Sequence, residues 1–484
     1  MKTYDICFPE KHIQKIFMLE TPGGEPAGLS AVIPTVTETS KPFDVRIAVY
    51  DANGYPSLKC NSEALIKSET TGKEMAAIKF NKGLPAIATV KNAVSPKSGF
   101  FRIAVCFNGR NFYSNPSLCE KHPRYRIFWG DPHVHTVLSD CHPDLCHSSM
   151  FAYAAARYLT GLDWISVTDH VSNGRGTTGK WLENKAAAEL YNCPFEFITL
   201  PAYEASLKGG AGGDNNVYLS KFPDCFVDEY EHGTLKTLCE KLWAKSVEQG
   251  FDFFVVPHHT SRSGKHGEMP ENVYPGKDLM PAVEIYSKWG SSEYYGNPHS
   301  LLQPHRGESY IVDYLKKGFA VGFIAGTDTH STMPSNKGRE PSHIPYKPGF
   351  TAVCSNSLTR ENVFNAIKAR KTYASGGNRI FLEFNVDGFS QGEIARRSRN
   401  EPRHICVRAA ASADIREIEF IRNGKVIKSV SVNKWTARIE FTDGDDIKNI
   451  CLESKNMGSF FFYYVRVRCD GDSQAWSSPV FFTL

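Results

Sequence analysis

Gly130-Asp131-Pro132-His133-Val134-His135-Thr136 follows directly on the apolar run 127–129 and decides how the middle of the chain is interpreted. The apolar run has the length and composition of a buried strand. Successive side chains of a strand point to opposite faces, so His133 and His135, two residues apart, project to the same side. Paired imidazoles on one face are typical of a metal site.

The same arrangement recurs along the central part of the chain, where apolar strands alternate with amphipathic helices. Several of these helices end at a glycine that leads into the next strand, as expected for a left-handed helix terminus. This alternation predicts a (β/α) barrel or a doubly wound parallel sheet. The expected strands are 127–129, 164–167, 197–200, 253–256, 282–285 and 321–324, and the helix-ending glycines are Gly161, Gly250 and Gly318.

The two flanks have a different pattern, with alternating apolar residues separated by Pro, Gly, Ser and Asn. Val45, Ile47 and Val49 share one face of a predicted strand, and Asn423-Gly424 predicts a hairpin turn near the other end of the chain. We therefore expect three domains: a β-sandwich-like domain over 1–123, a barrel over 124–378 and a second β-sandwich-like domain over 379–484.

Composition limits the function classes. Among 484 residues, 41% are hydrophobic and 22% charged, and the net charge is only +4, so neither a rod-like fold nor nucleic-acid binding is expected. No apolar stretch approaches the ~20 residues of a membrane span. Residues 1–20 lack the apolar core of a secretory signal, and the 13 cysteines form no C-x-x-C pair. These features favour a cytoplasmic protein that does not bind membranes.

Histidine is concentrated where the strands are expected. Fourteen of the 16 histidines lie between His122 and His343. Metal-ligand residue types follow the strands, and in a barrel the strand ends meet on one face. Imidazole and carboxylate ligands together favour two or three ions of Mn²⁺, Zn²⁺ or Fe²⁺, with Glu204 able to bridge two of them. The residues expected to converge are His133, His135, Glu204, His258, Asp328 and His330.

Several of these stretches in combination resemble the PHP (polymerase and histidinol phosphatase) superfamily, and three longer ones resemble a branch of it known as a domain of unknown function. The resemblance implies a distorted seven-stranded TIM-like (β/α) barrel with a three-metal cluster. It also implies that Asp140 and His170 bind the third ion. Where related sequences tend to have a histidine, this chain has Asp214, which either substitutes as an oxygen ligand or leaves one ion less fully bound. The stretches are 130–136, 168–170, Glu204, 257–259 and 326–330, and the longer ones are 283–293, 350–353 and 369–380.

Other residues near the strand ends complete the candidate site. Asp131, Asp214 and His259 are further candidate ligands, and Arg262, Lys288 and Arg306 are candidates for holding the outer oxygens of a phosphate or sulfate. Cys141 and Cys146 lie beside two histidines, but their spacing matches no common zinc module.

The sequence predicts a metal-dependent hydrolase that attacks a phosphoester of a small molecule with metal-activated water. Asp328, Glu204 and His258 are the expected catalytic residues. The same ligands would serve sulfate-ester or amide hydrolysis, and a non-catalytic ligand-binding protein with structural metals is the alternative from another class.

Overall fold

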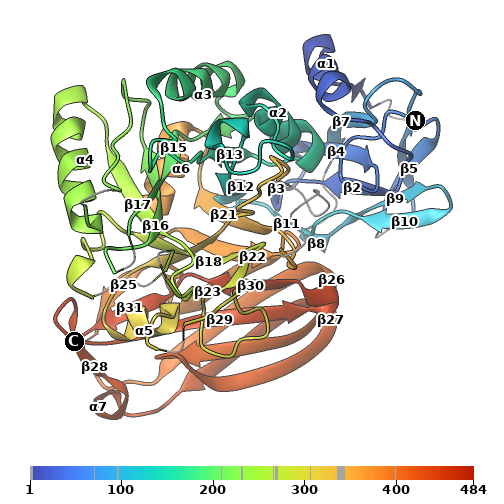
Figure 1. Ribbon diagram of the computed structural model, residues 1–484. Helices are drawn as coiled ribbons and strands as arrows, with labels where there is room; N and C mark the ends of the chain where they lie inside the picture. The colour runs from blue at the N-terminus through green and yellow to red at the C-terminus, as the bar shows by residue number, and fades with distance from the viewer. Residues whose placement is uncertain are drawn as a thin grey trace.

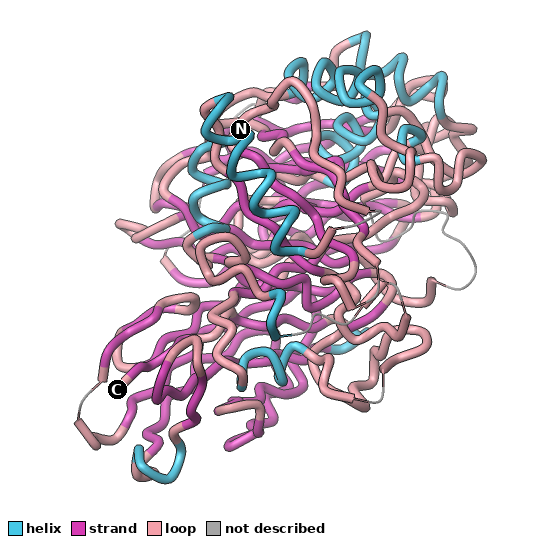
Figure 2. The backbone as a smooth tube through the Cα atoms, turned by 60° about the vertical axis from the view of Figure 1, so that its left-hand side comes forward, coloured by secondary structure: helices cyan, strands magenta, loops and turns pink. Residues whose placement is uncertain are grey.

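A computed structural model of the chain describes residues 4–69, 71–94, 98–208, 210–230, 233–264, 266–267, 271–305, 307–334, 344–397 and 399–484. The described part of the chain is mostly β, with 42% of its residues in strands and 17% in helices. Strands run through the middle of the molecule and most helices lie toward the outside (Figures 1 and 2). In the described residues no helix has the length and apolar character needed to cross a membrane.

The first part of the chain forms three small sheets and one helix. Val45, Val49, Ile66 and Val105 from two of the sheets share one hydrophobic core, as the alternating pattern predicts. The two four-stranded sheets, both antiparallel, are β1 (Ile6–Cys7), β7 (Ile87–Val94), β4 (Pro42–Tyr50) and β2 (Gly28–Val32), and β10 (Arg110–Tyr113), β9 (Ile103–Phe107), β5 (Glu63–Ser68) and β6 (Glu74–Lys79). The third contains β3 (Val36–Glu38), β11 (Ser117–Glu120) and β8 (Gly99–Phe101), and the helix is α1 (Lys11–Glu20).

A 14-stranded mixed sheet joins the centre of the chain to its last hundred residues. Its central part is β14 (Ile198–Thr199), β13 (Trp164–Val167), β12 (Arg126–Val134), β21 (Gly349–Ser355) and β22 (Thr372–Gly376). It continues through β30 (Gln474–Ser477), β29 (Gly458–Cys469), β26 (Arg403–Arg422), β23 (Phe381–Val386) and β24 (Phe389–Ser390). Off this path lie β25 (Ile394–Arg396), β27 (Lys425–Asp443), β28 (Leu452–Ser454) and β31 (Val480–Thr483).

Two three-stranded sheets complete the centre of the molecule. They are β15 (Ala202–Ser206), β16 (Asp214–Leu219) and β17 (Phe253–Pro257), and β19 (Gly290–Ser291), β18 (Ala282–Ser287) and β20 (Gly322–Ala325). The helices between the strands are α2 (Ser149–Ala154), which continues as a π-helical turn over 155–160, then α3 (Thr178–Tyr191), α4 (Leu235–Gln249), α5 (Ile311–Lys316), α6 (Arg360–Lys368) and α7 (Ile447–Ile450). Short 3₁₀ turns are η1 (Val137–Ser139), η3 (Glu271–Val273) and η4 (Asp470–Asp472).

The prediction of a (β/α) barrel or doubly wound parallel sheet from the alternating pattern is wrong. All six expected strands exist, and β12 pairs in parallel with β13, but its other neighbour is the antiparallel β21. The β15–β16–β17 sheet is antiparallel throughout. Antiparallel pairs interrupt the ring of parallel strands that a (β/α) barrel requires, so the sheets of the described residues stay open. The expected seven-stranded TIM-like closure is therefore absent from them.

The C-terminal strands are also arranged differently from the expected separate sandwich. β22 pairs with β30, placing Ala374 opposite Trp476, so these strands extend the central sheet. The hairpin turn is confirmed: Asn423 and Gly424 have φ of 50° and 77°, as a tight turn between β26 and β27 requires. The domain boundaries at 123/124 and 378/379 stay predictions.

Gly130 offers a test of how tightly the strand that leads to the site is packed. A Cβ at Gly130 would lie 2.1 Å from the Trp164 ring on β13, and Trp164 is fully buried. We expect Gly130→Ala to lower the free energy of unfolding by about 1–3 kcal/mol, measured by chemical denaturation. Gly444→Ala, where a Cβ meets no atom within 4 Å, is the control and should leave stability nearly unchanged. Equal stability of the two variants would contradict the packing described here.

Candidate metal centre

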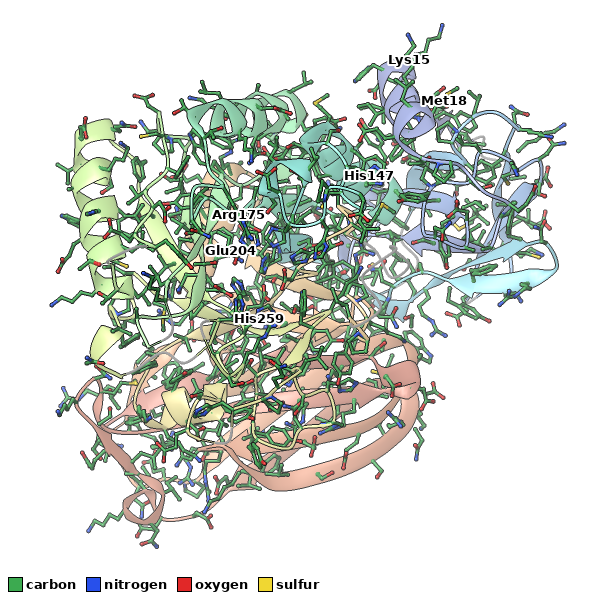
Figure 3. All side chains as sticks on the ribbon, viewed as in Figure 1. Lys15, Met18, His147, Arg175, Glu204 and His259 are labelled. Atoms are coloured by element: carbon green, nitrogen blue, oxygen red, sulfur yellow. The ribbon has the colours of Figure 1, made fainter. Side chains whose placement is uncertain are left out.

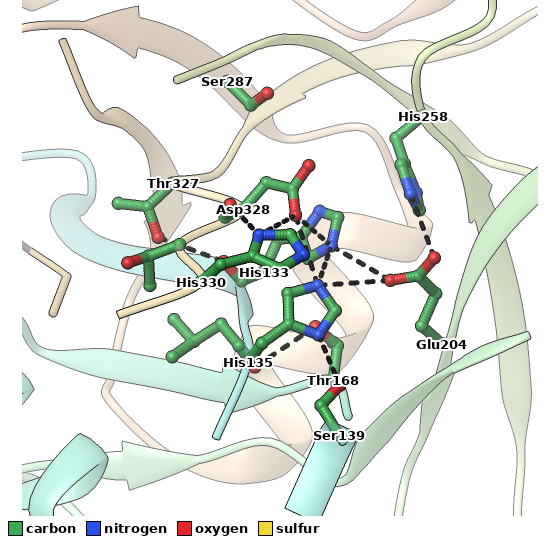
Figure 4. Close-up of polar contacts among 12 residues, drawn as sticks. His133, His135, Ser139, Thr168, Glu204, His258, Ser287, Thr327, Asp328 and His330 are labelled. Atoms are coloured by element: carbon green, nitrogen blue, oxygen red, sulfur yellow. Dashed lines mark hydrogen bonds and ion pairs between the residues drawn. The ribbon is translucent and has the colours of Figure 1, made fainter. Parts of the chain in front are cut away.

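Four buried side chains bring ligand atoms close together where the strands end (Figure 4). The Nε2 atoms of His133 and His135 are 3.2 Å apart. Asp328 Oδ1 lies 3.2 Å from each of them, and Glu204 Oε2 lies 3.4 Å from His133 Nε2 and 3.2 Å from His135 Nε2. We call these four residues the central cluster. The sequence prediction that they converge agrees with this geometry.

Backbone pairing at the strand ends brings the central cluster together. Asp328 N–H donates to the carbonyl of His133 (2.9 Å), and Val134 forms a parallel bridge with Thr329. A second parallel bridge joins His170 to Glu204. Figure 3 places Glu204 and His259 deep in the molecule, between the helical side and the large sheet. The ligands are thus held by main-chain hydrogen bonds rather than by loops alone.

Hydrogen bonds behind the two histidines fix which ring nitrogen faces the cluster. His133 Nδ1 donates to Glu284 Oε2 at 3.0 Å, which leaves the Nε2 lone pair pointing into the cluster. His135 Nδ1 shares a hydrogen bond of 2.9 Å with the Ser139 hydroxyl, and the same hydroxyl accepts from the N–H of His170. This arrangement is the usual support of metal-binding histidines.

The spacing of the central cluster fits an ion. Bonds of 2.0–2.2 Å in a tetrahedral site place ligand atoms about 3.3–3.6 Å apart. The two imidazole nitrogens lie 3.2–3.4 Å from each other and from each carboxylate oxygen, so either carboxylate together with the two histidines has close to this spacing. Two imidazole nitrogens 3.2 Å apart would otherwise have to share one proton. Buried His, Asp and Glu side chains of this protein can therefore hold a metal.

Further ligand atoms surround the second oxygen of Glu204. Oε1 lies 3.4 Å from His258 Nε2 and 3.3 Å from His170 Nδ1, whereas Oε2 faces the central cluster. His133, Glu204 and His258 form a second group of ligand atoms within 4.8 Å of one another. A carboxylate with its two oxygens in adjacent groups has the arrangement of a bridging ligand.

A third group consists of Asp214, His258 and His259. Asp214 Oδ2 accepts a hydrogen bond from His266 Nδ1 (2.7 Å), while its Oδ1 is buried with no hydrogen-bond partner among the described residues. His259 Nε2 lies 3.0 Å from Asp328 Oδ2. His259 and Asp328 both have positive φ, 52° and 50°, a backbone strain that is common at ligand sites.

The buried carboxylates and imidazoles of the site neutralise one another's charges. Burial alone would raise the pKa of Glu204 and Asp328, but the surrounding imidazoles hold the pKa of both carboxyls well below the usual range. Burial opposes protonation of His133, yet Asp328 and Glu284 raise its pKa well above the usual value. Burial lowers the pKa of His259, so that imidazole is neutral near pH 7. Both carboxylates are ionised and need positive charge beside them.

Three predicted ligands, Asp131, Asp140 and His330, are not part of these groups. The Asp140 carboxylate pairs with Lys180, and more than half of its surface is exposed. Asp131 accepts hydrogen bonds from Thr327, from its N–H at 2.9 Å and its hydroxyl at 2.6 Å, and a third from the N–H of His133. Asp131 thus connects β12 to the segment that carries Asp328. His330 lies beside the cluster, with its ring 4.5 Å from that of His135.

The predicted substrate-binding cations are placed differently from one another. The Arg262 guanidinium lies 5.5 Å from the centre of the Trp289 ring, and Trp289 packs 5.7 Å from His259. Lys288 is 3% exposed, and its backbone N–H donates to Thr327. Arg306 lies outside the described residues. Through Trp289, Arg262 adjoins His259 at the edge of the metal centre.

The sequence predicts no role for Glu284 or Trp289. It also does not predict that Cys141 lies in this cluster. Glu284 ends an expected strand, a signal that could have identified it, but only the structure shows its contact with His133. Cys141 follows Asp140 directly, and its sulfur joins His135 and His170 in a fourth group of ligand atoms. A hydrogen bond with Cys146 lowers the pKa of the Cys141 thiol, and His330 lowers it further.

Comparison with known proteins leaves the family open. No family model matches the chain. It is 32% identical over 308 residues to an uncharacterized protein of Chlamydia pneumoniae, covering 61% of this chain and 48% of that protein. An uncharacterized protein of Chlamydia trachomatis is 29% identical over 313 residues, covering 62% and 49%. The chain thus spans about half the length of the curated relatives it matches.

Solved structures add no argument. A β-glucuronidase of Bacteroides uniformis aligns with 94% of this chain and 61% of its own, at 9% identity and a TM-score of 0.19. A cycloisomaltooligosaccharide glucanotransferase of Paenibacillus reaches 0.25 at 8% identity, covering 94% of this chain and 72% of its own. Superpositions this poor define neither fold nor activity.

The first test of the site is its metal content. Protein purified without chelator should contain one to three transition-metal ions per chain, because the ligand groups around Glu204 adjoin one another. Elemental analysis measures this directly. Removal of the ions by chelator should lower the melting temperature, since metal binding adds to folding free energy. No metal after Zn²⁺ or Mn²⁺ supplementation would remove the basis of the site.

The second test concerns the support of His133. Glu284→Gln removes the negative charge behind the ring, so metal affinity should fall about 10–100-fold, measured by competition with a chelator. Glu183→Gln, on the exposed side of α3, is the matched control and should bind metal like the wild type. Unchanged affinity of Glu284→Gln would show that the contact with His133 does not tune the site.

Proposed function

We propose that this protein is a metal-dependent hydrolase acting on a phosphoester of a small molecule. The observation that carries the proposal is the buried pair His133 and His135, with a carboxylate oxygen of Glu204 and one of Asp328 each 3.2–3.4 Å from both Nε2 atoms, a spacing that suits a metal ion. The motifs that resemble the PHP superfamily support phosphoesters as the substrate class. The barrel that this resemblance implies is absent, so the support comes from the motifs and ligands alone.

A bound divalent ion would supply Lewis acidity, lowering the pKa of water and stabilising developing negative charge. The protein supplies orientation. Asp328 has one oxygen in the central cluster and the other beside His259, a position from which it can orient a water molecule or accept its proton. His259 is neutral near pH 7 and can take up a proton next to Asp328.

We assign recognition of the substrate to residues at the edge of the metal centre. Arg262 is half-buried above Trp289, where its guanidinium can hold two phosphate oxygens. We also propose that no nucleic acid is bound and that the protein works in a reducing, cytoplasmic compartment, on the charge and cysteine pattern. The alternatives are sulfate-ester or amide hydrolysis at the same ligands.

Asp328→Asn separates catalysis from a purely structural metal. The substitution keeps volume and packing but removes the charge, so hydrolysis should fall by ~10²-fold or more while the melting temperature changes little. The assay is hydrolysis of aryl phosphate, sulfate and amide substrates by metal-loaded protein. Asp278→Asn, on an exposed side chain, is the control and should keep full activity.

The pattern across the substrates decides between the functions. Cleavage of the phosphate confirms the proposal, and cleavage of only the sulfate or the amide favours those alternatives. If the wild type binds metal, hydrolyses none of them and loses much stability in Asp328→Asn, a binding protein with structural metals is the better account.

A further inference from the structure

The loop after η1 turns one expected ligand away and presents another. Asp140 has a left-handed backbone (φ 53°), and its carboxylate pairs with Lys180. The next residue, Cys141, faces the centre instead. The ligand atoms of His135, Cys141 and His170 all lie within 4.8 Å of one another.

The surroundings of the Cys141 sulfur are made of imidazoles. The Cys146 thiol and the His330 side chain both lower the pKa of the Cys141 thiol, and the Cys146 thiol donates to the backbone carbonyl of His330 at 3.2 Å. The rings of His135 and His170 stack at 4.6 Å, and the ring of His330 lies 4.5 Å from His135 on another side. His170 also reaches Glu204, so this set adjoins the central cluster.

We propose that the Cys141 thiolate, in place of Asp140, binds a metal ion together with His170 at an outer position beside the central cluster. This inference rests on the proposed metal-dependent function. His135 directs its Nε2 into the central cluster and gives that nitrogen to one ion only, so Cys141 and His170 are the donors specific to the outer position. On binding, the thiol loses its proton to solvent as the sulfur–metal bond forms.

A thiolate ligand changes which ion the position prefers. Sulfur is a soft ligand that favours Zn²⁺ or Co²⁺, whereas an aspartate at the same place would suit Mn²⁺ or Mg²⁺. The outer position should therefore select a thiophilic ion, even where the central cluster accepts Mn²⁺. Cys146, whose thiol donates to the backbone carbonyl of His330 and which is in none of the ligand groups, acts as a neighbour rather than as a ligand.

Cobalt substitution tests this directly, because a thiolate bound to Co²⁺ gives an intense near-ultraviolet charge-transfer band that nitrogen and oxygen ligands do not give. Chelator-stripped full-length protein would be titrated with Co²⁺ as wild type, Cys141→Ser and Cys146→Ser. The band should appear in the wild type and in Cys146→Ser and be lost in Cys141→Ser, which should also bind one ion fewer. Zn²⁺-loaded wild type should show one sulfur neighbour at about 2.3 Å by X-ray absorption.

The outcomes separate this inference from the function on which it rests. Co²⁺ bound by the wild type without the band, or a band that survives in Cys141→Ser, overturns the thiolate ligand while leaving the central cluster intact. A band lost only in Cys146→Ser would identify Cys146 as the sulfur ligand, and this result also overturns the inference. No Co²⁺ bound at all overturns both. The wild-type spectrum alone shows whether Co²⁺ binds without the band, even if a variant fails to fold.

Discussion

The neutralisation of Glu204 and Asp328 is the constraint on which the site depends. Each carboxylate is 2% exposed, and its pKa is held low by neighbouring imidazoles. An ionised carboxylate buried without a partner costs several kcal/mol. When no ion is bound, a proton shared between the Nε2 atoms of His133 and His135, whose pKa values are raised, provides positive charge. A divalent ion would provide it beside the same imidazoles.

The backbone around the centre is braced by two other carboxylates that are not needed as ligands. Asp131 accepts from the N–H and hydroxyl of Thr327, and Asp169 accepts in the same way from Thr136, at 2.6 and 2.7 Å. Each brace connects two strand ends that carry histidines or Asp328. The motifs in the sequence therefore contain two kinds of acidic residue, those that face the ion and those that hold the strands in place.

The sequence could predict the strands and most of the ligands because both depend on local pattern. Apolar runs of strand length become β12, β13 and β17, and the polar residues after them converge. Pairing direction depends instead on distant partners. The residues around Ala202–Ser206 contain no signal that this strand pairs antiparallel with Asp214–Leu219. The alternation of strands and helices therefore predicts a parallel barrel instead.

The sequence pattern also does not predict in which direction the side chains of a loop point. Asp140 and Cys141 are neighbours, and only the left-handed backbone at Asp140 together with the position of Lys180 decides which one faces the histidines. The role of Glu284 follows from a contact across 151 residues of sequence. Motif spacing carries no information about such contacts.

An anomalous difference map from crystals grown with Zn²⁺ tests the central claim most directly. The account predicts a strong peak in the central cluster of His133, His135, Glu204 and Asp328, at about 2.0–2.2 Å from both Nε2 atoms and from a carboxylate oxygen. A map with no peak there, in which these four side chains keep their contacts with one another alone, would contradict a metal centre.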